Sequence, residues 1–191
     1  MIFTLIGMPG CGKSCMGRAL ASKLKFKLID VDRMIERRVG QKLQTIIDEQ
    51  GVEYFRKLEE ETLLSIYSTG AHAIVSTGGS AVYSRAGMEH LKSLGKIVYL
   101  YCSYETISGR LGDFSKRGIV FKPGQDLRGL FDERTPLYKK YSDIVINCDG
   151  IAYPRYQHNA IRAIKSAIAI ARIEEEKRLA EKNADSCADT N

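Results

Sequence analysis

Short apolar runs and longer amphipathic stretches alternate along the whole chain. Apolar runs bounded by glycine or polar residues indicate buried strands, and apolar residues three or four positions apart indicate helices. The expected strands are residues 1–7, 26–30, 73–77, 96–101 and 143–147, and the expected helices are residues 13–24, 32–39, 43–68, 84–94, 103–111, 124–141 and one from about Pro154. Strands that alternate with helices predict a three-layer α/β fold, in which helices cover both faces of a parallel sheet.

No repeat or long linker divides residues 1–174, so we expect one domain and a monomeric protein. Within it, residues 112–123 combine glycines with several charges and are expected to form a mobile lid. Gly51 is expected to interrupt the long helix around it. Beyond residue 174 the sequence is polar and charged, which predicts a frayed tail over residues 175–191.

The chain carries 29 Lys and Arg against 23 Asp and Glu, which gives a net charge of +6. Because these basic residues are dispersed and form no block, we expect an anionic small molecule as partner and no nucleic acid. The sequence contains no apolar run of about 18 residues, so we expect no membrane span. The N-terminal run has no basic segment or cleavage site and is interpreted as a strand rather than a signal peptide.

The five cysteines are scattered and form no CxxC pair. Neither a disulfide framework nor a zinc site is therefore expected, and a reducing cytoplasm is the natural compartment. Cys11 and Cys15 lie four residues apart, but both fall in or beside a phosphate-binding pattern.

That pattern is residues 7–14, GMPGCGKS, which match GxxxxGK[ST] between an expected strand and an expected helix. Its glycines let backbone N–H groups surround a phosphate, and the helix N-terminus adds partial positive charge. Lys13 is placed to reach the β- and γ-phosphates of ATP, and the Ser14 hydroxyl to ligate Mg²⁺.

An acidic pair, Asp30 and Asp32, ends the second expected strand, where the ligand crevice of an open α/β sheet lies. One carboxylate can serve the magnesium shell while the other meets the hydroxyl of the acceptor. An alternative for Asp32 is to cap the helix that follows.

Further candidates lie on later segments. Gly78 and Gly79 follow the third strand and allow a ligand to approach the backbone closely. Arg110 and Arg117 flank or lie in the expected lid, where an arginine can neutralise a phosphoryl group in transfer. Arg134 precedes a proline in a helical pattern, and its guanidinium suits a carboxylate.

The motifs together resemble the shikimate kinase family over roughly residues 1–148. The residues that carry the resemblance are GMPGCGKS at 7–14, DVD at 30–32, FRKLE at 55–59, GG at 78–79, Arg117 and ERTPLY at 133–138. The resemblance implies strand order 2-3-1-4-5 and Mg²⁺-dependent transfer from ATP to the 3-hydroxyl of shikimate.

The resemblance also implies roles for single residues. Asp32 would hold the acceptor hydroxyls and act as the base, and Asp30 would support Mg²⁺ through water. Arg56 and Arg134 would clamp the carboxylate, with Glu59 holding Arg56 in place. The ring hydroxyls of the substrate would contact the backbone of Gly78 and Gly79. Arg117 would contact the phosphate and the substrate, and Arg110 would lie against the adenine. The remaining nucleotide contacts would come from Gly10, Cys11, Gly12, Lys13, Ser14 and Met16.

Three positions depart from the family pattern. Ser80 stands where a third glycine is usual, Gly118 follows the lid arginine in place of proline, and residues 147–151 differ from the usual adenine loop. A related gluconate-type kinase, a nucleoside monophosphate kinase and a nucleotide-binding regulatory module without turnover remain alternatives. A gluconate-type kinase would not need two arginines to bind a carboxylate. A nucleoside monophosphate kinase accepts on a phosphate, so an acidic acceptor site would be unfavourable. A regulatory module would have no catalytic role for Asp32.

Overall fold

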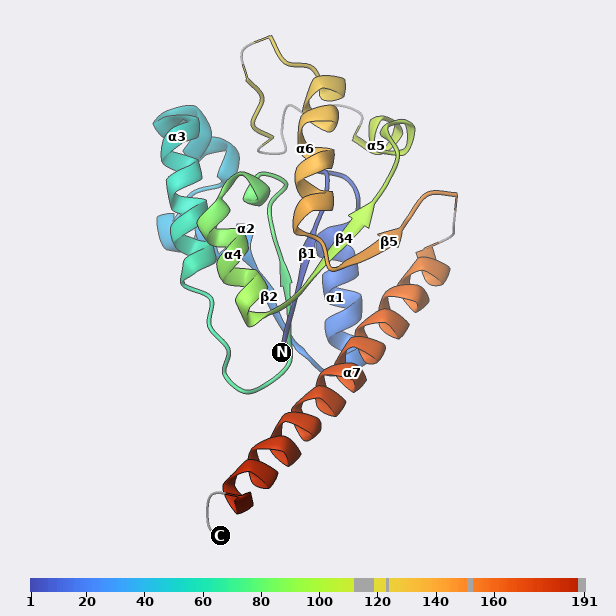
Figure 1. Ribbon diagram of the computed structural model, residues 1–191. Helices are drawn as coiled ribbons and strands as arrows, with labels where there is room; N and C mark the ends of the chain where they lie inside the picture. Colours follow the sequence, from blue (N-terminus) through green and yellow to red (C-terminus); the bar gives the residue numbers. More distant parts are fainter. Residues whose placement is uncertain (112–118, 123, 151–152, 189–191) are drawn as a thin grey trace.

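The structure is a computed structural model that describes residues 1–111, 119–122, 124–150 and 153–188, with the side chains of the last helix from Pro154 to Lys177. Its strands are β1 (Ile2–Ile6), β2 (Lys27–Asp30), β3 (Ala73–Ser76), β4 (Gly95–Tyr101) and β5 (Ile144–Asn147). They form one parallel sheet in the order β2-β3-β1-β4-β5, which confirms the expected fold class (Figure 1).

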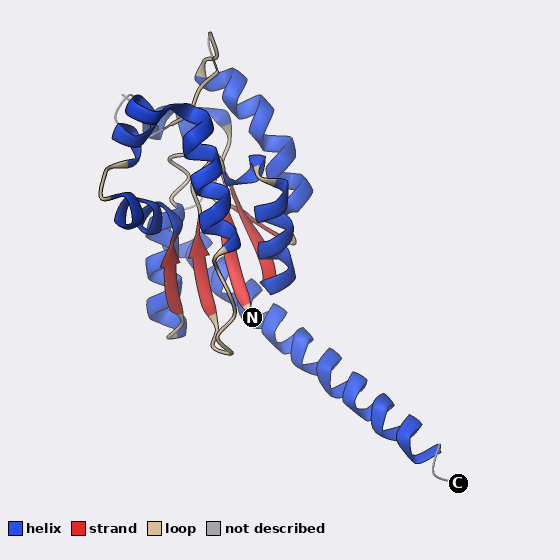
Figure 2. Ribbon diagram, turned by 90° about the vertical axis from the view of Figure 1, so that its left-hand side faces the viewer, coloured by secondary structure: helices blue, strands red, loops and turns tan. Residues whose placement is uncertain are grey.

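Helices cover the sheet on both faces, as Figure 2 shows. They are α1 (Lys13–Leu24), α2 (Val31–Val39), α3 (Leu43–Leu64), α4 (Arg85–Leu94), α5 (Tyr104–Leu111), α6 (Leu127–Tyr141) and α7 (Tyr153–Ala188), with a short 3₁₀ turn, η1, at Ala81–Tyr83. Helices α1 and α7 pack against each other, and α3 packs against both α2 and α4. All five residues of β1 are buried, which agrees with its apolar sequence, interrupted only by Thr4.

The long helix α3 is interrupted at Gly51, as expected, where φ is 83° and ψ is 168°. A left-handed φ is accessible to glycine at little cost, so the break needs no further strain. The helix ends at Leu64 rather than near residue 68, and Ala81–Tyr83 form a 3₁₀ turn that the pattern does not predict. This turn lies between α3 and α6 and matters for the site below.

The C-terminal helix differs from the expectation of a frayed tail, because α7 continues to Ala188. Its buried residues are Tyr156, Gln157, Ala160 and Ile164, whereas Ile170 and Ile173 are about half exposed. Beyond the body the helix extends outward alone, as both views show (Figures 1 and 2). The residues there are mainly Glu, Lys, Arg, Ala and Leu, whose strong helix propensity favours a helix without tertiary contacts.

Candidate active site

A cavity of about 550 Å³ opens where the carboxyl ends of the central strands meet. This is the position at which parallel α/β sheets bind their ligands. The residues that line it come from the phosphate loop, α1, α2, α3, the turn after β3, residues 119–120 and α6: Pro9, Gly10, Gly12, Lys13, Ser14, Cys15, Arg18, Asp32, Leu43, Phe55, Thr77, Gly78, Gly79, Ser80, Ile119, Val120 and Arg134.

The phosphate loop joins β1 to α1, and its shape depends on glycine. Gly10 and Gly12 have φ of 81° and 98°, and Gly12 forms the left-handed N-cap of α1. A side chain at Gly7 would lie 2.7 Å from the carbonyl oxygen of Leu100. At Gly10 and Gly12, which line the cavity, the loop therefore presents backbone without a side chain, as a phosphate site requires.

Lys13 is only 8% exposed, and its ammonium group bonds the loop itself. Its Nζ donates to the carbonyl oxygens of Gly7 at 2.7 Å and Met8 at 3.0 Å. Next to it Ser14 is exposed to the cavity. The cation and the hydroxyl thus lie beside the same phosphate-sized space.

The acidic pair is arranged differently from the expectation, since Asp30 and not Asp32 caps α2. The carboxylate of Asp30 accepts from Arg33 N at 3.2 Å, and Asp30 is absent from the lining of the cavity. Asp32 lies in the first turn of α2 and lines the cavity. Since Asp30 is already in the extended conformation that a cap requires, Asp32 is left free to face the ligand.

Asp32 is partly buried, and its buried Oδ1 atom has no hydrogen-bond partner in the described structure. Burial raises its pKa to about 6, while Lys13 opposes that rise and the charges of Asp30 and Glu36 add to it. A carboxyl group whose pKa lies near neutrality is suited to accept a proton from a substrate hydroxyl.

Glu59 on α3 is a second buried carboxyl group at the site, only 2% exposed. Burial raises its pKa to about 7, and a hydrogen bond with Ser80 opposes the rise. Ser80, which replaces a glycine of the family pattern, therefore pairs with Glu59. Sequence reasoning assigned Glu59 to Arg56 instead.

Arg134 is 2% exposed and is fixed by partners from two other segments. Its Nη2 donates to the carbonyl oxygen of Val120 at 3.2 Å, and its Nε donates to Tyr83 Oη at 3.2 Å. A Cβ at Gly79 would lie 3.0 Å from its Nη1, so glycine there lets the guanidinium approach the turn after β3. Tyr138, on the same helix as Arg134, donates to the Gly79 carbonyl oxygen at 2.7 Å and anchors that turn.

Arg56 does not line the main cavity but a neighbouring one of about 290 Å³, which shares Ser80 with it. Its guanidinium pairs with Glu53 at 3.6 Å, so the bridge observed is not the expected one to Glu59. One turn separates Arg56 from Glu53, whereas Glu59 is turned toward Ser80. The guanidinium of Arg56 lies 4.9 Å from the centre of the Tyr83 ring.

The expected adenine contact, Arg110, is exposed at the end of α5, and its Nη1 contacts Cys102 Sγ at 3.5 Å. Helix α5 lies over the phosphate loop, since a Cβ at Gly10 would lie 3.1 Å from Leu111. Cys11 and Met16 are buried in the core, so their side chains pack and do not line the cavity.

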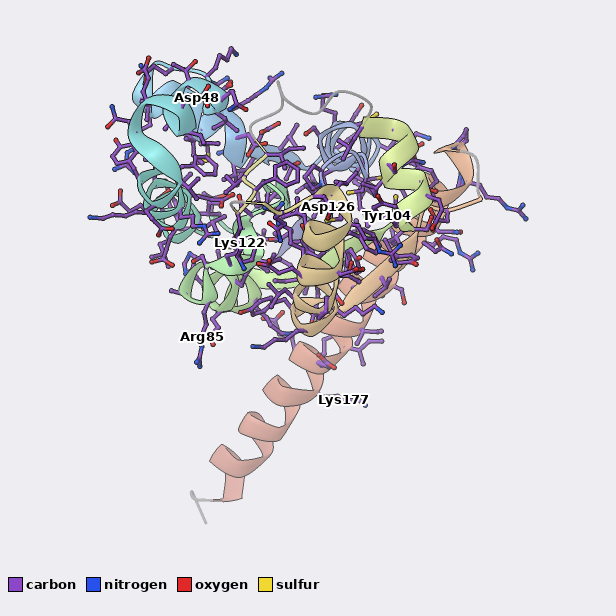
Figure 3. All side chains as sticks on the ribbon, turned by 90° about the horizontal axis from the view of Figure 1, so that it is seen from above. Asp48, Arg85, Tyr104, Lys122, Asp126 and Lys177 are labelled. Atoms are coloured by element: carbon purple, nitrogen blue, oxygen red, sulfur yellow. The ribbon has the colours of Figure 1, made fainter. Side chains whose placement is uncertain are left out.

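Of the expected lid, Arg117 and Gly118 lie outside the described residues. Ile119 and Val120 line the cavity, which brings this segment over the site. Lys122 pairs with Glu133 of α6 at 2.9 Å, and Asp126 caps α6 through Gly129 N; Figure 3 labels both Lys122 and Asp126.

The donor set near the phosphate loop fits Mg²⁺, the ion expected for this chemistry. The Ser14 hydroxyl is a hard oxygen ligand that lines the cavity, and Asp32 lines the same cavity. Asp30, expected to act through water, caps α2 through its Oδ1 and is absent from the lining of the cavity, so its role toward Mg²⁺ stays a prediction.

Comparison with known proteins agrees with this geometry. The family model described as shikimate kinase matches residues 9–169. The chain is 35% identical to a shikimate kinase of Sulfurihydrogenibium sp. over 145 residues, covering 76% of this chain and 86% of that protein. It is 37% identical to that of Pseudomonas paraeruginosa over 147 residues, covering 76% and 85%.

Solved structures give the same result. The structure of shikimate kinase from Acinetobacter baumannii in complex with shikimate aligns with a TM-score of 0.75 and 31% identity, covering 86% of this chain and 93% of that one. Shikimate kinase from Aquifex aeolicus aligns with a TM-score of 0.72 and 27% identity, covering 88% and 96%. The phosphate loop, Asp32 and the fixed Arg134 all lie at one cavity, and these comparisons show that this chain belongs to the shikimate kinase family.

Proposed function

We propose that this chain transfers the γ-phosphoryl group of ATP to the 3-hydroxyl of shikimate, with Asp32 as base and Arg134 as the main carboxylate ligand. The kinase activity and its acceptor follow from family membership over residues 9–169 and from the extensive similarity to shikimate kinases. The observation that carries the residue roles is that Lys13, Asp32 and Arg134 line one cavity.

The acceptor half rests on charge placement. Asp32 has an unpartnered oxygen and a pKa of about 6, so near neutral pH it is largely ionised and can take the hydroxyl proton as the O–P bond forms. Arg134 is buried and already positioned by Val120 and Tyr83, so it can bind a carboxylate with little loss of conformational entropy. Arg56 would complete the clamp from the neighbouring cavity.

The nucleotide half rests on the phosphate loop. Backbone N–H groups of the loop hold the β-phosphate, while Lys13 neutralises negative charge as the γ-phosphoryl group leaves. Ser14 would hold Mg²⁺, which when bound neutralises charge on the phosphate oxygens, and this leaves Asp32 to act as the base. Arg110 and Arg117 are proposed to contact adenine and the transferred phosphoryl group, respectively.

We propose a monomer in the cytoplasm, whose reducing conditions suit the free thiols of Cys11, Cys102 and Cys148. Across the described residues, no helix combines the length and apolar character needed to cross a lipid bilayer.

A coupled ADP-release assay on a panel of hydroxy acids tests the acceptor, and NMR of the product locates the phosphate. We expect turnover with shikimate, phosphate at its 3-hydroxyl, and loss of activity without Mg²⁺. Equal or faster turnover of gluconate would contradict the acceptor assignment and leave the kinase assignment intact. ADP binding without any turnover would instead favour a regulatory nucleotide-binding protein.

A further inference from the structure

Tyr83 is the one aromatic residue described as contacting both arginines of the proposed clamp. The guanidinium carbon of Arg56 lies 4.9 Å from the centre of its ring, and that of Arg134 lies 5.1 Å from the same centre. Both distances fall within the range in which a cation is attracted to the face of an aromatic ring.

The position of Tyr83 in the chain explains how it reaches both groups. It ends the 3₁₀ turn η1, which packs against α3 and α6, the helices that carry Arg56 and Arg134. Arg56 and Arg134 come from segments far apart in the sequence, so their separation is not fixed by either helix alone. The ring of Tyr83 lies between those segments and contacts both.

The hydroxyl of Tyr83 also restricts the orientation of the Arg134 guanidinium. It accepts a hydrogen bond from Arg134 Nε at 3.2 Å, and it is also hydrogen-bonded to Glu133. Glu133 is held in turn by Lys122 at 2.9 Å and by Gln125 at 2.8 Å. With its Nε bonded to this network and one Nη to Val120, Arg134 has few orientations open to it.

We propose that Tyr83 is a positioning residue that holds Arg56 and Arg134 at the separation needed to bind one carboxylate. The proposal rests on the proposed function, in which these arginines bind the shikimate carboxylate. Two guanidinium groups repel each other, and the negative face of the ring lowers the cost of keeping both near one anion. Tyr83 itself does not line the main cavity, so it acts through the arginines.

This role predicts a selective effect on the carboxylate. Loss of the ring should weaken binding of an acid by about 10- to 100-fold, because two cation–π contacts and one charge-assisted hydrogen bond disappear. An uncharged acceptor should lose much less. Loss of the hydroxyl alone, in Tyr83→Phe, should cost about 3- to 10-fold, since the ring contacts remain.

The test measures kcat and KM for shikimate, for its uncharged methyl ester and for ATP in the wild type and the variants Tyr83→Leu and Tyr83→Phe. Tyr104→Leu is a matched control, because Tyr104 makes a similar contact with Arg128 at 4.8 Å outside the cavity (Figure 3 labels Tyr104). We expect a raised KM for shikimate in Tyr83→Leu, a smaller rise in Tyr83→Phe, and no change in the KM for ATP. Tyr104→Leu should keep the wild-type ratio of acid to ester.

Several results would overturn the proposal. If the wild type prefers the acid and both Tyr83 variants keep that preference, the carboxylate clamp stands and Tyr83 does not position it. Equal losses for acid and ester, with a lowered Tm, would mean that Tyr83 only supports the fold. If Tyr83→Leu does not fold, the acid-to-ester ratio of Tyr83→Phe decides. A wild type that does not distinguish acid from ester would reject the clamp itself, and the role of Tyr83 with it.

Discussion

Asp32 and Glu59 direct their carboxylate oxygens at the same small volume beside Gly78. A Cβ built on Gly78 would lie 2.6 Å from Glu59 Oε1 and 3.1 Å from Asp32 Oδ1. Both oxygens are buried without a hydrogen-bond partner in the described structure, and the charge of Asp32 helps to raise the pKa of Glu59. The absence of a side chain at Gly78 is thus a condition for placing two carboxyl groups together.

Gly78→Ala should therefore impair both stability and catalysis. The added methyl group requires Glu59 to move in a packed site, which typically lowers the free energy of unfolding by about 1–3 kcal/mol. We expect kcat/KM for shikimate to fall by at least about 10-fold, because Asp32 shifts from its position. Gly109→Ala is the control: Gly109 lies in α5, where a Cβ would meet no other part of the described structure within 4 Å beyond its own helix, so the variant should keep its activity and keep or slightly raise its Tm. Wild-type kinetics in Gly78→Ala would mean that Asp32 needs no such space.

The pH dependence of activity should report the raised pKa of Asp32. The base must be ionised in the free enzyme, so kcat/KM should decline as the pH falls through about 6. In Asp32→Gln or Asp32→Asn this acidic limb should disappear. A profile for the wild type that stays flat down to pH 5 would place the pKa elsewhere or remove Asp32 from the proton transfer.

Asp32 and Glu59 should make the stability of the fold change with pH in the opposite direction to the activity. The folded-state pKa values of Asp32 and Glu59 are raised from 3.8 and 4.5 to about 6 and 7, so protonation favours the fold. Their contribution is fully present below about pH 4 and is lost as the pH rises through 6 to 7. Relative to Glu59→Gln, the wild type should lose Tm between pH 5 and pH 8. Parallel Tm curves for the two proteins, measured by calorimetry, would contradict a raised pKa for Glu59.

Asp32→Asn and Arg134→Ala should separate chemistry from acceptor binding. Loss of a general base typically costs about 10²–10⁴-fold in kcat, and ATP affinity should change little. Arg134→Ala should mainly raise the KM for shikimate, by roughly 10- to 150-fold for one charge-assisted hydrogen bond. Steady-state kinetics with each substrate varied distinguishes the two. Normal turnover in Asp32→Asn would return Asp32 to a structural role.

Truncation after residue 174 should leave the kinase intact. Among the described side chains of α7, the last that packs against the core is Ile168, and Ile170 and Ile173 are about half exposed. Residues 1–174 should therefore keep kcat and KM within about twofold and lose little Tm, since surface changes are usually small in effect. A chain that ends at residue 159 loses the buried Ala160 and Ile164 and should be strongly destabilised. Equal Tm losses in the two truncations would show that the distal helix has a partner.

The sequence predicts the sheet and the phosphate loop well, because local patterns determine both. Apolar runs mark the strands, and glycines with Lys13 mark the loop irrespective of what packs around them. The roles of Asp30 and Asp32 are harder, because either can cap a helix and only the observed backbone places the cap at Asp30. The exact residue at which α2 begins therefore decides which of the two carboxylates lines the cavity.

Contacts between distant segments are where the sequence says least. The partners of Arg56 and Glu59 depend on how η1 packs between α3 and α6. No local sequence pattern near Tyr83 indicates that its ring contacts two arginines. The tail beyond residue 174 differs for another reason. Its composition suits an exposed helix as well as a disordered segment, and charge alone does not decide between them.

The two hydrogen bonds from Lys13 to the carbonyl oxygens of Gly7 and Met8 make nucleotide binding an exchange rather than a simple addition. An ammonium group has three hydrogens, and in this structure all three have partners: the two carbonyl oxygens and, at 4.0 Å, Cys11 Sγ. Each further phosphate contact must therefore draw the lysine away from the loop that it holds together. The affinity for ATP then depends on the free-energy difference between Lys13 bonded to the loop and Lys13 bonded to a phosphate. The rigidity of the loop therefore matters as much as the charge of the phosphate.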